Sequence, residues 1–291
     1  MVPCPGLELH LRPFAVAGAY LSTSPEYQMK RLLAGGLERI FQLAHAFRDE
    51  ERGDHHVREF SMLEWYRVGA SLADLMEETE ALFAEVAGAV LGTSHAPGID
   101  GGAVDLTPPW ERLGVSEAFE RYAGVLCTGE EDGGVLGERA RAAGWVIPAG
   151  LTDWDEVFAR IFVEAVEPHL GRGRPTLLHR WPARSAALSR LDPLEPAVAL
   201  RFEVFAGGVE LANAFQELTD ASEQRRRLVA DLEERRARGL PCPPLDERFL
   251  GSLAEGLPDV SGIALGVDRL VMLLVGARRI DEVLTFTPEE L

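Results

Sequence analysis

The sequence predicts an α+β fold in which a mainly antiparallel sheet is flanked by helices. Strand-like stretches are grouped at residues 40–66 and 176–218, and stretches with helical spacing surround both groups. Of the 291 residues, 46% are hydrophobic and 26% are charged, which is the balance of a globular protein with a core. At roughly 150 residues per domain, this length allows one large domain or two ordinary ones. We expect a single domain over residues 1–291.

The N-terminal elements follow from local signals. Alternating apolar residues over 7–14 predict a strand. Ser24 suits the N-cap of a helix, Pro25 suits its first position, and the Gly35-Gly36 pair suits its end. We therefore expect the first helix to run from Pro25 to this glycine pair.

Two strands and a long helix are expected next. Residues 40–47 and 60–66 are strand-like and flank a charged loop. Apolar residues at helical spacing predict a helix over 71–90. The Gly- and Pro-rich stretch 92–109 indicates a loop or a short hairpin.

The second half of the chain contains both helix-like and strand-like patterns. Residues 110–170 predict several helices. Residues 176–218 predict strands, with a hairpin turn at Gly207-Gly208. We expect a charged helix over 221–238, and a short strand that enters a helix within 262–275.

The charge and cysteine content limit the function classes. The net charge of −18 opposes non-specific binding of nucleic acid, and Lys30 is the only lysine. Three widely spaced cysteines form neither a disulfide framework nor a metal knuckle. The cysteine pattern therefore favours a reducing cytoplasm. The sequence has no apolar run of about 18 residues and no signal pattern at its start, so we expect no membrane partner.

The two strands at 40–66 place chemically useful side chains on one face. With a period of two, Arg48 shares a face with small alanines, while Phe60, Glu64 and Tyr66 share a face of the second strand. An arginine can bind phosphate, an aromatic ring can stack on a base, and a carboxylate can hold an ammonium group. Taken alone, the pattern is more typical of a solvated hairpin with surface ion pairs.

A second group lies around the predicted turn at Gly207-Gly208. A two-residue turn places Glu203 and Glu210 diagonally on one face, within reach of a shared cation such as Mg²⁺. The same register places Asn213 on the opposite face, unless a bulge or the end of the strand intervenes. A charged sheet face is an equally good interpretation of this pattern.

A third group lies where the last strand enters a helix. Gly266 permits close approach of the backbone, and Arg269 lies in the first turn of the helix. An ordinary strand–helix corner explains the same residues. His55 and His56 have no third ligand at a suitable spacing, so we do not expect a metal there.

These groups occur in one order, and together they resemble a known family. The matching stretches are residues 23–31, 47–66, 201–220 and 261–273. The chain resembles the catalytic domains of class II lysyl-tRNA synthetases. More closely, it is similar to their EpmA (PoxA, GenX) paralogues, the elongation factor P–(R)-β-lysine ligases. The resemblance implies a class II aminoacyl-tRNA synthetase-like catalytic domain over 1–291, without an anticodon-binding domain.

The resemblance also implies a role for each matching residue. Arg48 and Arg269 would be the catalytic arginines that clamp the α- and γ-phosphates of ATP. The implied ATP-binding residues are Arg48, Glu50, His56, Phe60, Glu210, Leu211, Gly266 and Arg269. The implied amino-acid-binding residues are Ser24, Pro25, Glu26, Glu64, Tyr66, Asn213, Glu217 and Ala264. Glu203 and Glu210 would bind Mg²⁺.

Two features favour the paralogue over a lysyl-tRNA synthetase. The first is that the matching motifs begin at once, so we expect no N-terminal anticodon-binding domain. The second is a pair of substitutions in the implied amino-acid site. Ala264 stands where lysyl-tRNA synthetases usually have glycine, and Ser24-Pro25-Glu26 replaces their Ala-Pro-Glu. One methyl group in a tight pocket can change discrimination by roughly 1–3 kcal/mol. The N-terminal helix and strand of motif 1, a dimer element, have no counterpart before Met1. The resemblance therefore leaves homodimer formation open.

The implied reaction has two steps and uses ATP and Mg²⁺. A lysine-type amino acid is activated as its adenylate, and a lysine side chain of elongation factor P then attacks it. Two alternatives come from different classes. The chain could be the catalytic part of a lysyl-tRNA synthetase, although the acidic charge makes tRNA an unexpected partner. It could also be a non-catalytic regulatory protein, which the complete set of charged residues opposes.

Overall fold

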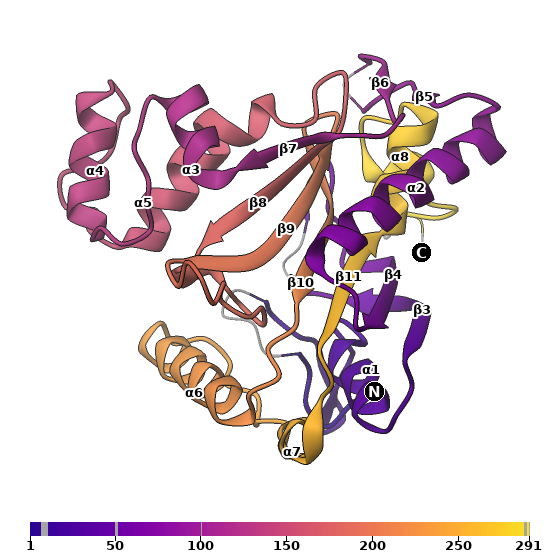
Figure 1. The fold of residues 1–291 in the computed structure, drawn as a ribbon, viewed down its shortest axis with the longest axis vertical. Helices are drawn as coiled ribbons and strands as arrows, with labels where there is room; N and C mark the ends of the chain where they lie inside the picture. The colour runs from indigo at the N-terminus through magenta and orange to yellow at the C-terminus, as the bar shows by residue number, and fades with distance from the viewer. Residues whose placement is uncertain (7–10, 50–51, 100, 288–289, 291) are drawn as a thin grey trace. The chain divides into compact units, whose positions relative to one another are not determined.

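A computed structural model describes residues 1–6, 11–49, 52–99, 101–287 and 290 (Figure 1). By its internal contacts the chain divides into two compact units. The single domain expected from the sequence stays a prediction. Unit 1 comprises residues 1–75, 214–272 and 277–291, and unit 2 comprises residues 76–213 and 273–276.

The sheet of unit 1 is built on the predicted hairpin. β3 pairs antiparallel with β4, and β4 pairs antiparallel with β11, so these strands lie side by side (Figure 1). The end of β10 follows β11 in the strand order. The strands of this sheet in unit 1 are β3 (Arg39–Phe47), β4 (Glu59–Val68) and β11 (Val260–Gly266), while β1 (Ala15–Val16) and β2 (Ala19–Tyr20) form a separate two-stranded sheet.

Helices of unit 1 pack on one another through aromatic and apolar side chains. The rings of Tyr27 in α1 and Phe249 in α7 stack with their centroids 4.2 Å apart. Asp220 and Asp246 accept hydrogen bonds from backbone N–H groups at the starts of α6 and α7, as N-cap residues do. The helices are α1 (Glu26–Ala34), α6 (Ala221–Ala237), α7 (Glu247–Gly256) and a short turn over Ile280–Val283.

The sheet of unit 2 has the strand order β7-β8-β9-β10. β8 and β9 are antiparallel, whereas β7 and β8 are parallel. Gly207 and Gly208 both have positive φ, 64° and 79°, which a two-residue hairpin turn of type I′ requires. The strands of this sheet are β7 (Glu111–Gly114), β8 (Thr176–Pro182), β9 (Val198–Ala206) and β10 (Val209–Gln216), the last of which ends in unit 1. A separate two-stranded sheet is formed by β5 (His95–Ala96) and β6 (Val104–Asp105).

An aromatic cluster forms the core of unit 2. The ring of Phe158 stacks on Phe119 and on Trp154, with 4.8 Å between centroids in each pair. All three rings are buried, and such pairs stabilise a core beyond the area they bury. The helices are α3 (Val115–Ala118), α4 (Gly133–Ala142) and α5 (Trp154–Ile161), with short helical turns over 119–123, 162–166, 167–169 and 183–185. α2 (Leu72–Leu91) and α8 (Val267–Val275) begin in unit 1 and continue in unit 2.

The structure confirms the α+β class and the mainly antiparallel sheet, and it corrects four details. β7 is a strand within the stretch predicted to be helical, because it pairs with β8, which is distant in sequence. α7 was not predicted, although Asp246 as an N-cap residue and the apolar residues at helical spacing both indicate a helix there. The first helix begins at Glu26, one residue late, with Pro25 at the N-cap position. Of the predicted strand at 7–14, residues 7–10 lie outside the described residues, and the rest shows only a bridge from Arg12 to Asp49.

Within the described part of the chain, no helix combines the length and the apolar composition that crossing a bilayer requires.

Two glycines of unit 2 provide a matched test of the packing against β9. Gly171 and Gly173 have similar positive φ, 68° and 72°. A Cβ at Gly171 would lie 2.4 Å from the carbonyl oxygen of Phe205, whereas at Gly173 nothing lies within 4 Å. We expect Gly173→Ala to lower the free energy of unfolding by about 1–2 kcal/mol, and Gly171→Ala to lower it by about 1–3 kcal/mol more. Urea unfolding measures both, and equal losses would contradict this packing.

Candidate active site

The side chains of the β3–β4 hairpin alternate between two faces, as the sequence predicts. Ala46 pairs with Phe60 and Gln42 with Glu64, so the even-numbered residues share one face. On that face Glu64 and Tyr66 are buried, with 1% and 3% of their surface exposed. On the opposite face Phe41 and Leu43 of β3 are exposed. The buried face is thus the one that carries the predicted site residues.

Glu64 is the centre of a buried hydrogen-bond network. The Ser24 hydroxyl donates to Glu64 Oε2 at 2.8 Å, and the Tyr66 hydroxyl donates to Glu64 Oε1. Burial and the nearby charge of Glu26 raise the pKa of Glu64 to about 7. Burial and the charge of Glu64 raise the pKa of Tyr66 well above its ordinary value, so its hydroxyl stays a donor.

Two more carboxylates lie at the same place and share a buried ammonium group. Lys30 Nζ lies 2.5 Å from Glu26 Oε1 and 2.6 Å from Glu217 Oε2. Lys30 and Glu217 are each 1% exposed. Burial raises the pKa of Glu217 to about 8, although the charge of Lys30 acts in the opposite direction. We call Ser24, Glu26, Glu64, Tyr66 and Glu217 the acidic pocket.

β11 contributes small residues to this pocket. Gly262 pairs with Tyr66 and Ala264 pairs with Glu64. A Cβ at Gly262 would lie 2.2 Å from Tyr66 Cε1 and 2.7 Å from Glu217 Oε1, so only glycine leaves room for both side chains. The predicted substrate residue Pro25 is buried at the start of α1, next to Ser24.

The predicted nucleotide residues of unit 1 gather near the tip of the hairpin. The Arg48 guanidinium lies over the Phe60 ring, 5.2 Å from its centroid, and Arg48 Nε lies 3.4 Å from the Thr23 carbonyl oxygen. An arginine held over an aromatic face can bind a phosphate while the ring packs against a base. Glu50 lies outside the described residues.

The start of α8 is joined to the same hairpin. Asp268 accepts a hydrogen bond from the Ser61 N–H at 2.7 Å, and Arg269 Nε donates to the His55 carbonyl oxygen at 3.0 Å. Arg269, the second predicted catalytic arginine, is therefore hydrogen-bonded to the loop that follows Arg48. Gly266 pairs with Met62 at the end of β11, and His56 is exposed in a turn of the loop.

In unit 2, Glu203 and Glu210 form the predicted carboxylate pair. Burial and the charge of Glu210 raise the pKa of Glu203 to about 8, because both disfavour the ionised form of Glu203. A divalent cation would relieve this repulsion, so the donor set fits Mg²⁺. Among the described residues no larger cluster of His, Cys, Asp or Glu has the form of a metal site. Two carboxylates would leave the remaining positions of Mg²⁺ to water and phosphate.

Arg201 organises the surroundings of Glu203. It contacts the Glu203 carboxylate, donates to Asn213 Oδ1 at 3.1 Å, and lies 4.4 Å from the centroid of the Trp181 ring. The predicted substrate residue Asn213 is therefore bound to Arg201 within unit 2. Because the same guanidinium contacts Glu203, the prediction that Asn213 lies on the face opposite Glu203 is wrong. Leu211 is 2% exposed.

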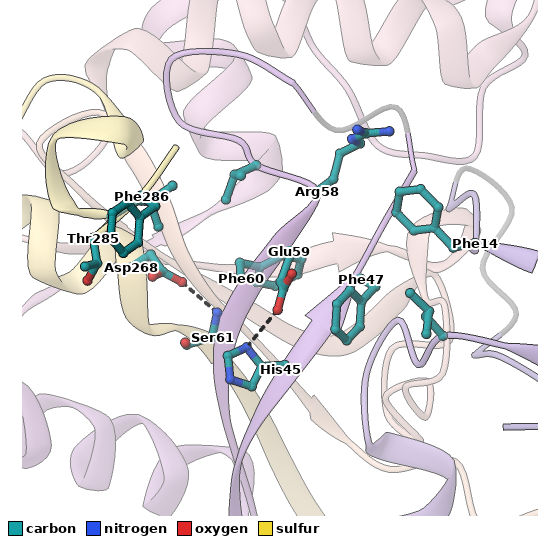
Figure 2. Close-up of a pocket in the computed structure, with 13 residues that line it drawn as sticks. Phe14, His45, Phe47, Arg58, Glu59, Phe60, Ser61, Asp268, Thr285 and Phe286 are labelled. Atoms are coloured by element: carbon teal, nitrogen blue, oxygen red, sulfur yellow. Dashed lines mark hydrogen bonds and ion pairs between the residues drawn. The ribbon is translucent and has the colours of Figure 1, made fainter. Parts of the chain in front are cut away.

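A separate cavity of about 680 Å³ lies along the other face of the hairpin. Figure 2 shows His45 and Glu59 pointing toward each other there, with Asp268 beside Ser61. Phe60 and Asp268 reach its lining, but Glu64 and Tyr66 do not. This cavity is not the acidic pocket.

Three residues were missed by sequence reasoning. Lys30 stands four residues after Glu26, the spacing of an ion pair on a helix, and this signal was available. Gly262 and Arg201 gave no such signal, because their roles come from strand register and from contacts distant in sequence.

Comparison with known proteins identifies the family of the chain. Residues 8–290 match the family model of the class II tRNA synthetases (D, K and N). A protein of Klebsiella pneumoniae subsp. pneumoniae, named elongation factor P–(R)-β-lysine ligase, is 41% identical over 290 residues, covering 96% of this chain and 84% of that protein. A protein of the same name from Salmonella paratyphi B is 40% identical with the same coverage.

The raised pKa of Glu64 predicts how stability depends on pH. Between the ordinary pKa of 4.5 and about 7, folded Glu64 keeps a proton that the unfolded chain has lost. Its contribution to the free energy of unfolding therefore falls as pH rises through this interval. We expect Glu64→Gln, which cannot ionise, to remove this part of the decline. Urea unfolding of both chains between about pH 5 and 8 measures the two slopes; parallel curves would contradict the burial of an ionisable group here.

Proposed function

Because this chain belongs to the class II tRNA synthetases (D, K and N), we propose that it activates a lysine-type amino acid with ATP and transfers it to elongation factor P. The acceptor is a lysine side chain of that protein, and (R)-β-lysine is the proposed amino acid. The observation that carries this proposal is the acidic pocket, whose carboxylates form a buried site for ammonium groups. The free cysteines Cys4, Cys127 and Cys242 support a cytoplasmic location.

The first step needs positioning and charge neutralisation more than proton transfer. The carboxylate of the amino acid attacks the α-phosphorus of ATP, the bond to the bridging oxygen breaks, and pyrophosphate leaves. No general base is required, because the carboxylate is already ionised. Arg48 and Arg269 are proposed to neutralise charge on the phosphates, and Phe60 to pack against adenine.

The second step forms an amide. The ε-amine of the acceptor lysine attacks the adenylate carbonyl, the bond to the phosphate oxygen breaks, and AMP leaves. The attacking nitrogen loses one proton in the process. The acidic pocket would hold the acyl group still while a large protein substrate approaches its carbonyl.

Mg²⁺ is proposed to bind Glu203 and Glu210, where it would offset the negative charge of the phosphates. Arg201 would keep the Glu203 carboxylate oriented.

The choice among lysine isomers is proposed to depend on Glu64. Ser24 donates to this carboxylate, and Ala264 is its partner across the strands. These are the two positions of the predicted amino-acid site at which the sequence favours the paralogue over a lysyl-tRNA synthetase. A hydroxyl group and a methyl group therefore change the surroundings of one carboxylate, which is where a shifted amino group would be detected.

Elongation factor P and tRNA are the two acceptors to compare. We expect elongation factor P, incubated with the enzyme and ATP, to gain the mass of one acyl group from (R)-β-lysine and less from (S)-β-lysine or α-lysine. Intact-mass spectrometry measures this, and aminoacylation of tRNA-Lys is run beside it. Charged tRNA together with unmodified elongation factor P would favour a tRNA synthetase instead.

The two arginines can be tested in the first step alone. We expect Arg48→Ala and Arg269→Ala each to slow ATP–pyrophosphate exchange by about 10²–10³-fold, because each removes a charged donor from the transition state. Arg39→Ala is the control and should keep full activity, because Arg39 is exposed at the start of β3, the strand that ends just before Arg48. Undiminished exchange in either site variant would refute the assigned role, and loss of all exchange in the control would show a general effect of arginine removal.

A further inference from the structure

Lys30 is the one lysine of the sequence, and it lies inside the acidic pocket. Its side chain extends from α1 and joins Glu26 of the same helix to Glu217, which follows β10. The ammonium group is also 6.0 Å from the centroid of the Phe249 ring. It is 1% exposed, so its charge is balanced by protein groups and not by water.

The charged groups around Lys30 do not balance one another. Glu26 on α1, Glu64 on β4 and Glu217 after β10 supply three carboxylates, and Tyr66 on β4 supplies a neutral hydroxyl. When all three carboxyl groups are ionised, Lys30 compensates one of the three charges. Two remain for a ligand, and a lysine-type amino acid carries two ammonium groups.

A purely structural ion pair would not need this arrangement. Replacing a buried ion pair with apolar groups is often neutral or stabilising, so burial alone does not account for a lysine here. Lys30 instead contacts two carboxylates that are proposed to bind the substrate, and these carboxylates come from two different parts of the chain.

We propose that Lys30 is a positioning residue of the acidic pocket: it fixes the carboxylates of Glu26 and Glu217 and sets the pocket's charge to that of an amino acid with two ammonium groups. This inference rests on the proposed function, since it concerns the same site. Lys30 acts through the carboxylates and takes no part in the chemistry.

The protonation states support this role. Burial opposes the charge on Lys30, but Glu217 and Glu26 outweigh it and raise the pKa of Lys30 above its ordinary value. Lys30 in turn lowers the pKa of Glu217, which burial and the charges of Glu26 and Glu64 raise to about 8. Without Lys30, the carboxyl of Glu217 would keep its proton to a higher pH and bind an ammonium group less well.

The decisive variant is Lys30→Met, which keeps the length of the side chain and removes its charge. ATP–pyrophosphate exchange gives KM for the amino acid, KM for ATP and kcat over a range of pH. We expect KM for the amino acid to rise about 10- to 100-fold, with KM for ATP unchanged. The pH below which KM for the amino acid increases should move upward by about one unit.

Arg31→Met is the matched control, because it removes a cation from the next position of α1 that contacts neither Glu26 nor Glu217 in the described ion pairs. It should leave all three parameters and the pH profile unchanged. Unchanged KM and pH profile in Lys30→Met would overturn the inference while leaving the proposed function intact. Exchange in the unaltered enzyme that does not depend on any lysine-type amino acid would overturn both.

A second measurement uses the unaltered chain and so does not depend on folding of the variant. Because the sequence holds one lysine, labelling with ¹⁵Nζ-lysine gives one side-chain ammonium signal from the protein. We expect this signal to shift when unlabelled β-lysine or α-lysine saturates the pocket, and to stay in place when ATP alone is added. A signal that does not respond to a bound lysine-type ligand would refute the positioning role.

Discussion

The pocket of unit 1 depends on one buried ammonium group that contacts two carboxylates. Transfer of an isolated charge from water into a protein interior costs several kcal/mol or more, so buried charges persist only when they are paired. Lys30 supplies that pairing for Glu26 and Glu217, while the hydroxyl groups of Ser24 and Tyr66 serve Glu64. One ammonium group thus contacts two carboxylates here, and this unequal pairing is the feature on which the proposed binding of a cationic amino acid rests.

Strand geometry is what brings these groups together. Alternation along β4 places Glu64 and Tyr66 on one buried face, and the register with β11 sets small residues opposite both. Gly262 leaves the space that Tyr66 and Glu217 occupy, and Ala264 adds a methyl group across from Glu64. The shape and the charge of the pocket therefore come from the same pairing of two strands.

The carboxylates of unit 2 are likewise partly compensated by one basic side chain. Arg201 contacts Glu203 and is itself held by Asn213 and by the face of Trp181. In each unit a basic side chain held by its neighbours compensates part of the carboxylate charge and orients the carboxylate groups. The ligands proposed for the remaining charge are an ammonium group in unit 1 and a divalent cation in unit 2.

The sequence by itself determined the elements with strong local signals: the hairpin and its two faces, the turn at Gly207-Gly208, and most helices. It also carried the motifs by which the chain resembles its family. Only the tertiary structure decided that Lys30 joins Glu217, that β7 pairs with β8, and that Arg48 lies over Phe60. The physical reason is that periodicity fixes the face on which a side chain lies, whereas its partner and its burial depend on segments that are distant in sequence and meet only in the folded chain.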